Sequence, residues 1–218
     1  MPRIEYQLCR ESKEEIIPRC LSCIGAGNCF LMEHHSGGLP RAVFFDRDGT
    51  LIRDVPYNGD PSLVTPLPGA REAVAAVRRC GLPVGVVTNQ SGVGRGLLSR
   101  QQVDAVNARV TELLGPFDLW CICPHAPEAG CSCRKPAPGM LLQAARHLGF
   151  RPTDLALIGD IGADMEAAAA AGARGVLVPT SVTRQAEIDA APEMAATIGE
   201  AVALLLQPDR LHHPAVLR

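Results

Sequence analysis

Two aspartates, Asp46 and Asp48, follow a run of apolar residues in the segment FFDRDGT (44–50). Residues two apart in an extended chain point the same way, so both carboxylates can face one site. Carboxylates this close are stable when a cation lies between them, and their oxygen ligands suit Mg²⁺. Asp46, ionised and bound to Mg²⁺, could attack phosphorus, while Asp48 could donate and later accept a proton. The alternative is a metal site or a surface turn without catalysis.

Three further segments carry residues suited to phosphate chemistry. Thr88 begins TNQSGVGRG (88–96), where a hydroxyl and glycine-rich backbone N–H groups could cradle a phosphate, although such a run is also common in ordinary strand-to-helix loops. Lys135 could neutralise a transferring phosphoryl group, and Arg134 could hold a second phosphate with its planar fork. The chain has only two lysines, and the alternative for Lys135 is a solvated charge.

The segment GDIGAD (159–164) supplies two more carboxylates, four residues apart. Asp160 follows an apolar run, as Asp46 does, and could complete the magnesium site. Asp164 falls in the first turn of the next predicted helix. We expect it to orient Lys135 or a water molecule on the metal.

Cysteine and histidine are spaced as metal ligands in the segment 123–133. Cys123-x-His125 and Cys131-x-Cys133 provide four nitrogen and sulfur ligands around a short loop, which suits a structural Zn²⁺. Such a zinc would fix the loop that presents Arg134 and Lys135. The alternatives are buried thiols or a disulfide. Cys121 is expected to face the core, and Cys80, at a helix end, is expected to have a packing role only.

Short β-rich runs alternate with helical segments over residues 42–206, and this alternation is what must position these side chains. The predicted strands are 42–46, 82–89, 117–123, 155–160 and 175–179. The predicted helices are 68–81, 99–115, 138–149, 163–173 and 198–206. Alternating strands and helices predict an α/β fold, a Rossmann-like three-layer sandwich with a mostly parallel sheet. Ligands of such sheets bind at the carboxyl ends of the strands, where the polar residues lie.

Composition sets limits on the class of protein. The 218 residues suffice for one α/β domain, and 47% hydrophobic with 20% charged residues is typical of a globular chain. A net charge of −2 gives no indication of a nucleic-acid or anionic-membrane partner. With no apolar run of membrane-spanning length and no signal peptide at the start, a cytoplasmic location is expected. Nine cysteines then suggest metal ligands before disulfides.

The N-terminal segment differs from the rest of the chain. Residues 1–40 lack periodicity and end in a linker-like HHSGGLP, so we predict a poorly ordered extension before a domain at 41–218. Its cysteines and histidines could form a second metal site, although a floppy extension or an early start codon is favoured. These residues are Cys20, Cys23, Cys29, His34 and His35.

The motif order DxDGT, TNQSG, RKP and GDxxxD resembles the haloacid dehalogenase superfamily of aspartyl phosphotransferases over residues 41–180. The resemblance implies a capless fold with a zinc-bearing loop, in which Asp46 is the nucleophile and Asp48 the general acid/base. It implies that Thr88 and Lys135 stabilise the phosphoryl group. By resemblance the Mg²⁺ ligands are Asp46, Asp160 and the main-chain carbonyl of Arg47, with Asp48 contributing through its main chain or from the second shell. Substrate contacts are implied at Asp54, Tyr57, Thr88, Asn89, Gln90, Ser91, Arg134 and Lys135.

The fuller motifs resemble the subfamily that contains D-glycero-D-manno-heptose 1,7-bisphosphate 7-phosphatases and histidinol-phosphate phosphatases. Ile161 departs from it, since lysine often stands there in the heptose enzymes. The glycine-rich loop favours a heptose bisphosphate, and the five-residue spacer between His125 and Cys131 favours histidinol phosphate. We give more weight to the loop, because it contacts substrate, and therefore expect a monomeric phosphatase of a small phosphorylated sugar. A polynucleotide 3′-phosphatase is disfavoured by the acidic balance, and a non-catalytic phosphate-binding module by the intact motifs.

Overall fold

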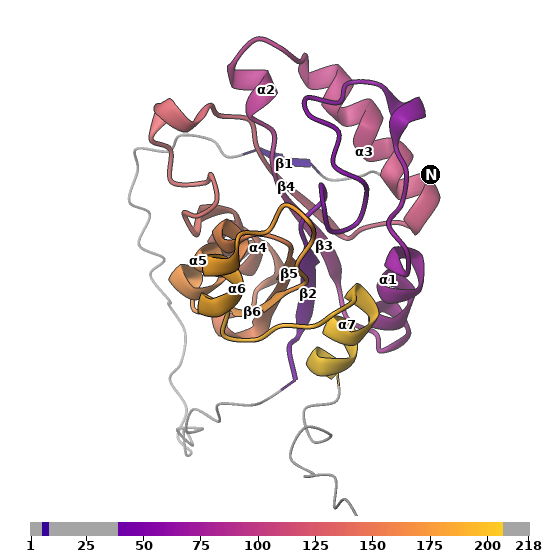
Figure 1. Cartoon of the computed structure of the whole chain (residues 1–218), viewed down its shortest axis with the longest axis vertical. Helices are drawn as coiled ribbons and strands as arrows, with labels where there is room; N and C mark the ends of the chain where they lie inside the picture. The colour runs from indigo at the N-terminus through magenta and orange to yellow at the C-terminus, as the bar shows by residue number, and fades with distance from the viewer. Residues whose placement is uncertain (1–5, 9–38, 207–218) are drawn as a thin grey trace, which may run out of the picture.

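A six-stranded parallel sheet forms the centre of the computed structural model, which describes residues 6–8 and 39–206 (Figure 1). The strand order is β1-β4-β3-β2-β5-β6. The strands are β1 (Tyr6–Leu8), β2 (Ala42–Phe45), β3 (Val84–Asn89), β4 (Leu119–Cys123), β5 (Leu155–Gly159) and β6 (Arg174–Leu177). All five strand pairs are parallel, so the predicted α/β fold class is confirmed.

Helices cover both faces of the sheet and complete the three-layer sandwich (Figure 1). They are α1 (Ala70–Arg79), α2 (Ser91–Gly94), α3 (Arg100–Leu114), α4 (Gly139–Leu148), α5 (Gly162–Ala171), α6 (Gln185–Ala190) and α7 (Ile198–Leu206). Of the described helices, none is long and apolar enough to cross a membrane. Helices α1, α3 and α7 lie on one face, and α4 and α5 lie on the other.

Strand β2 shows how the sequence produces this layering. Val43 and Phe45 belong to the core cluster under α1, α3 and α7, whereas Ala42 and Phe44 belong to the cluster under α4 and α5. Successive side chains of a strand point to opposite faces, so a strand covered on both sides needs four apolar residues in a row. The fifth residue, Asp46, is therefore delivered past the end of the core.

The elements agree with the sequence pattern, with a few differences. Ser99 caps α3 and accepts from the Gln102 N–H, as its position predicts. Helix α1 begins at Ala70 and not at Pro68, because Gly69 takes the N-cap with a left-handed backbone. Helices α2 and α6 and the strand β1 were not predicted, since each is too short for a periodic signal.

Strand β1 lies within the N-terminal 40 residues, where the sequence predicts only a poorly ordered extension. It pairs with β4 at the edge of the sheet, with Gln7 opposite Cys121. The cysteines and histidines of that segment lie outside the described residues.

The chain between β2 and α1 leaves no room for a separate cap domain. Residues 46–69 form a loop that contains one 3-10 turn, η1 (Pro61–Leu63). The loop is held to itself by isolated bridges that join Ile52 to Asp48 and to Pro66. The predicted capless arrangement is therefore confirmed.

Candidate active site

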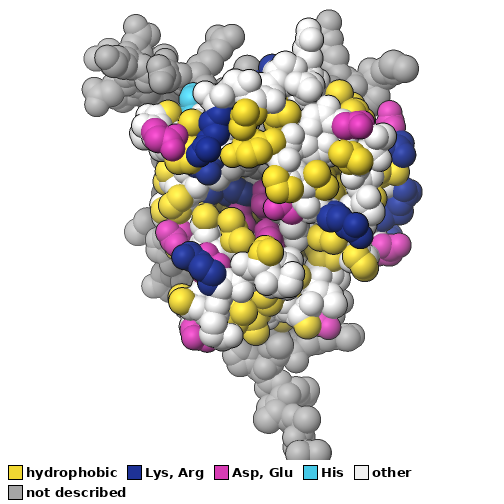
Figure 2. Space-filling view, turned by 45° about the horizontal axis from the view of Figure 1, so that its top comes forward, with side chains coloured by type: hydrophobic (Ala, Val, Ile, Leu, Met, Phe, Trp, Pro, Cys, Tyr) yellow, Lys and Arg dark blue, Asp and Glu magenta, His cyan; other side chains and the backbone are white. Residues whose placement is uncertain are grey.

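Three buried carboxylates meet at the carboxyl end of the sheet. Asp46 follows β2 and Asp160 follows β5, and because these strands are hydrogen-bonded neighbours their ends lie side by side. Asp164 lies in the first turn of α5. Oxygens of Asp46, Asp160 and Asp164 lie within 4.8 Å of one another. Figure 2 shows acidic side chains in a hollow at the centre of this face, with hydrophobic and basic side chains around it.

Gly49 permits this close approach. A Cβ at position 49 would clash with Oδ2 of Asp160, and the Gly49 φ of 82° also favours glycine. The next residue, Thr50, donates its hydroxyl to Oδ1 of Asp160 at 3.3 Å. The glycine and threonine of the DxDGT motif therefore place Asp160 beside the nucleophile candidate.

The carboxylates carry more negative charge than the described side chains neutralise. Burial raises the pKa of Asp46 well above its ordinary value, against the lowering effect of Lys135. Burial, and next the charge of Asp164, raise the pKa of Asp160 to about 7. Three acidic groups here face one lysine. A divalent cation with oxygen ligands would resolve this excess, so the donor set fits Mg²⁺.

Lys135 lies between two of these carboxylates. Its Nζ is 2.7 Å from Asp46 Oδ1 and 2.6 Å from Asp164 Oδ1, and it donates to the Val87 carbonyl at 3.0 Å. Burial alone would lower the pKa of Lys135, but the charges of Asp164 and Asp46 raise it above its usual value. The lysine is therefore a fixed cation beside the nucleophile candidate. Asp164 orients it, in agreement with the first of the two roles expected from the sequence.

Gln90 and Asn89, which are predicted to contact substrate, also hold other site residues. The Gln90 amide donates to Asp48 Oδ2 and to Thr88 Oγ1, both at 2.9 Å. The Asn89 side chain donates to the Lys135 carbonyl and accepts from the Lys135 N–H, both at 3.1 Å. The end of β3 therefore positions the general acid candidate on one side and the lysine on the other.

The carbonyl of Arg47 is not suited to the metal role that the resemblance implied. It accepts hydrogen bonds from the N–H groups of Leu51 and Ile52, both at 3.0 Å, and these occupy its two lone pairs. Among the backbone hydrogen bonds of residues 39–206, none ends on the Asp48 carbonyl. The main chain of Asp48, the other assignment made from the sequence, is therefore the better ligand candidate.

Four other predicted contact residues lie on the segments that carry the site residues. Asp54 is exposed, and partial burial and the charge of Asp48 raise its pKa, so it lies within electrostatic reach of Asp48. Tyr57 is 47% exposed, and its ring packs against Gly92 at the start of the glycine-rich loop. Ser91 begins α2. Arg134 is half-buried, and within residues 39–206 its buried Nη1 has no hydrogen-bond partner.

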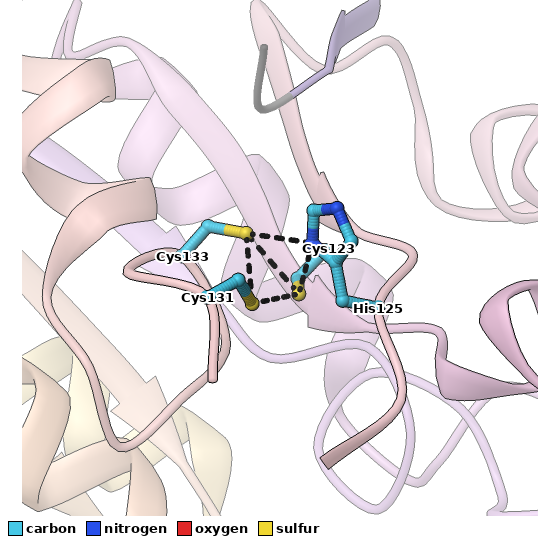
Figure 3. A group of neighbouring side chains, drawn as sticks. All are labelled: Cys123, His125, Cys131 and Cys133. Carbon is cyan, nitrogen blue, oxygen red and sulfur yellow. Dashed lines mark hydrogen bonds between the residues drawn. The ribbon is translucent and has the colours of Figure 1, made fainter. Parts of the chain in front are cut away.

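The predicted zinc ligands converge on one point (Figure 3). Five of the six distances among the three sulfurs and His125 Nδ1 are 3.2–3.7 Å, and all four atoms lie within 4.8 Å of one another. Ligands around a tetrahedral Zn²⁺ would be about 3.6–3.8 Å apart, given bonds of about 2.3 Å to sulfur and 2.0–2.1 Å to nitrogen. Hydrogen bonding from Cys133 lowers the pKa of Cys123 to about 5, which favours the thiolate that metals bind. The cluster fits a structural zinc site.

The described cysteines differ in their surroundings. The sulfurs of Cys123, Cys131 and Cys133 lie 3.3–3.7 Å apart, too far for a disulfide bond, so the disulfide alternative does not hold within the cluster. Cys121 is buried as expected, and burial raises its pKa to about 12. Cys80 lies at the end of α1, as expected, but it is exposed, so it packs less than predicted.

The zinc loop and the glycine-rich loop are joined by their backbones. The Gln90 N–H donates to the Cys123 carbonyl at 2.7 Å, and the Gly94 N–H donates to the Pro124 carbonyl at 2.8 Å. A Cβ on Gly94 would lie 2.7 Å from the Ala126 nitrogen, so this contact requires glycine. The four-ligand cluster thus supports Gln90 as well as the Arg134–Lys135 segment.

This arrangement of strand ends defines the class of haloacid dehalogenase (HAD)-like hydrolases. A family model described as HAD-hydrolase-like matches residues 132–204. The chain is 39% identical over 147 residues to the D-glycero-beta-D-manno-heptose-1,7-bisphosphate 7-phosphatase of Pseudomonas aeruginosa, covering 63% of this chain and 80% of that protein. The chain therefore belongs to the HAD-like hydrolase family.

Two further proteins extend the comparison. A Mesorhizobium japonicum protein with the same name is 42% identical over 150 residues, which span 63% of this chain and 69% of that protein. The crystal structure of the D,D-heptose 1,7-bisphosphate phosphatase from B. bronchiseptica, complexed with magnesium and phosphate, has a TM-score of 0.70 and 30% identity. It covers 77% of this chain and 99% of that one.

Proposed function

We propose that this chain is a Mg²⁺-dependent phosphatase that removes the 7-phosphate of D-glycero-β-D-manno-heptose 1,7-bisphosphate. One observation carries the chemistry: Lys135 Nζ lies 2.7 Å from Asp46, beside the acidic residue Asp160. The names of the relatives support the substrate. We also expect the protein to act as a monomer in the cytoplasm.

In the first step an oxygen of Asp46 forms a bond to the phosphorus of the 7-phosphate, and the bond from phosphorus to the sugar oxygen breaks. The proton of Asp48 moves to that sugar oxygen, so the heptose leaves as an alcohol. Lys135 neutralises charge on the transferring group, and the buried Thr88 hydroxyl shares the Gln90 amide with Asp48. The product is an aspartyl-phosphate on Asp46.

In the second step a water molecule attacks the phosphorus of the aspartyl-phosphate. Its proton goes to Asp48, which is now a carboxylate, and Asp46 leaves as a carboxylate. Mg²⁺ held by Asp46, Asp160 and the Asp48 main chain would supply positive charge to the phosphoryl oxygens. The zinc cluster would keep the Arg134–Lys135 segment in place without touching the substrate.

The reaction is tested by replacing the nucleophile. Asp46→Asn should abolish turnover because an amide does not form the aspartyl-phosphate, while thermal unfolding stays close to that of the wild type. Steady-state phosphate release and a thermal melt of the same preparation provide the measurement. Turnover within about tenfold of the wild type would contradict the assignment.

Arg134 supports a bisphosphate as the substrate. The reacting phosphate is already served by Lys135 and Thr88, whereas Nη1 of Arg134 is buried with no partner among the described residues. A buried donor without a partner costs about 1–3 kcal/mol, and a second phosphate would remove that cost with a charge-assisted bond. Histidinol phosphate, the substrate favoured by the short zinc spacer, carries no second phosphate.

The substrate is tested with Arg134→Ala, with Arg146→Ala on the exposed side of α4 as the matched control. Loss of about 1.5–3 kcal/mol should lower kcat/KM for the bisphosphate about ten- to a hundredfold. The same parameter for a small monophosphate should change little, and the control should leave both unchanged. Equal losses on both substrates would assign Arg134 to the reacting phosphate. Faster turnover of histidinol phosphate by the wild type would favour that substrate instead.

A further inference from the structure

Arg47, the residue between the two aspartates of the motif, is only 2% exposed. A buried guanidinium is costly unless each nitrogen finds a partner. Here all three do: Nε and Nη2 bond the Asp48 carboxylate at 3.0–3.2 Å, and Nη1 donates to Asn107 Oδ1 at 2.7 Å. The side chain therefore links the general acid candidate to a residue sixty positions away.

Asn107 lies on α3 in a position that the helical pattern assigns to the core. Its neighbours on the buried face, Val103, Val106 and Val110, belong to the apolar cluster against the sheet, and Asn107 itself is fully buried. Its Nδ2 has no partner among the described residues, so Oδ1, which accepts from Arg47, is the atom in use. Burying an amide in an apolar cluster costs stability. The side-chain hydrogen bond that Asn107 makes here is to Arg47, which bonds Asp48 in the active site.

We propose that Asn107 and Arg47 form a positioning pair that holds the carboxyl of Asp48 in the orientation needed for proton transfer to the leaving oxygen. Asp48 lies on a loop and its side chain is 23% exposed, so the loop alone does not fix it. Gln90 bonds one oxygen from β3, and Arg47 bonds both oxygens from the other side. Helix α3 is packed in the core, so Asn107 gives this series of hydrogen bonds a rigid attachment.

The inference rests on the role of Asp48 in the proposed function and adds residues to it. If the pair served stability alone, an apolar replacement of similar shape would be close to neutral for catalysis. If the pair positions Asp48, replacing one of its members should slow the steps in which Asp48 gives or takes a proton. A misplacement of about 1 Å near a reacting centre can lower rates about a hundredfold.

The test uses Asn107→Leu, which removes the acceptor, and Asn107→Asp, which keeps an acceptor oxygen of the same size. Each is assayed with two substrates that differ in the leaving group. The first is an alkyl phosphate, whose alkoxide must be protonated as it leaves. The second is 2,4-dinitrophenyl phosphate, whose phenolate leaves without a proton.

The parameter kcat/KM covers only the steps up to release of the alcohol or phenol. Asn107→Leu should therefore lower kcat/KM for the alkyl phosphate by about ten- to a hundredfold and change it less than about threefold for the aryl phosphate. Water attack still needs Asp48, so the aryl substrate should give a burst of phenolate as phosphorylated Asp46 accumulates. Asn107→Asp should restore the alkyl activity. Arg47→Lys, which lacks the fork that reaches both partners, should behave like Asn107→Leu.

Two results would overturn the inference. One is an equal loss on both substrates without a burst, which would indicate general damage to the site. The other is an unchanged kcat/KM for the alkyl phosphate in either Asn107→Leu or Arg47→Lys. A thermal melt shows which variant folds, and each variant that folds is a separate test. A wild type that hydrolyses neither phosphate ester would instead contradict the proposed function.

Discussion

Binding of Mg²⁺ should depend steeply on pH because Asp160 must lose a proton to bind the metal. Burial and the charge of Asp164 raise the pKa of Asp160 to about 7 in the metal-free protein. At pH 8 the carboxylate is ionised, whereas at pH 5 a group with a pKa of about 7 is about 1% ionised. The apparent dissociation constant for Mg²⁺ should therefore be about a hundredfold larger at pH 5 than at pH 8. Asp46, whose pKa is also raised by burial, adds to the effect in the same direction.

Isothermal titration with MgCl₂ at pH 5, 6 and 8 provides the measurement. At pH 6, repeating the titration in buffers of different ionisation enthalpy should show about 0.9 proton released from Asp160 for each Mg²⁺ bound. Release should be smaller at pH 8, where Asp160 is already ionised. Asp160→Asn is the control, and it should bind Mg²⁺ weakly at every pH. Dissociation constants within about threefold of each other at pH 5 and pH 8 would refute the reasoning.

The raised pKa of Asp160 also determines whether the metal-free protein gains or loses stability as the pH rises. Between pH 3.8 and about 7 the folded, metal-free protein keeps the Asp160 proton that the unfolded chain has lost. Its stability should therefore be highest at the acidic end of this window and fall as pH rises through it, by on the order of 4 kcal/mol at most from this group. Saturating Mg²⁺ should oppose the fall, and thermal melts with and without Mg²⁺ check the direction.

Two further predictions concern the zinc cluster and the DxDGT glycine. Cys131→Ser should reduce the zinc content from about one per chain to near zero by elemental analysis and lower the melting temperature by several degrees, because metal affinity is part of the folding free energy; full zinc content in the variant would contradict the four-ligand site. Gly49→Ala should weaken Mg²⁺ binding and lower kcat/KM at least about tenfold, since the new Cβ would clash with Asp160 Oδ2. Wild-type kinetics in Gly49→Ala would mean that Asp160 lies elsewhere.

The charged residues of the site were predictable because their type and their place in the sequence already indicate their chemistry. Asp46 and Asp160 each follow an apolar run, and parallel strands bring such ends to one edge. Lys135 stood out as one of two lysines, and the ion pairs with Asp46 and Asp164 explain why it differs from a solvated charge. The cysteine spacing predicted a cluster that the structure assembles.

The roles of neutral residues were harder to predict. The resemblance predicted Gln90 and Asn89 only as substrate contacts, and it gave no sign that their amides would also bond Asp48 and Lys135. Asn107 was missed, since an isolated asparagine in a helix gives no signal by itself. Its place on the buried face among valines was the one clue, and it has meaning only once the helix is docked against Arg47.

The short strand β1 has a consequence for the solubility of shortened forms of the protein. Strand β4 has the sequence LWCIC, without charge or proline, and β1 pairs with its outer edge. A form that begins at residue 39 would expose the backbone N–H and C=O groups of that edge. Uncovered strands of this composition are templates for pairing with a second copy, so self-association would follow from the loss of the short strand β1.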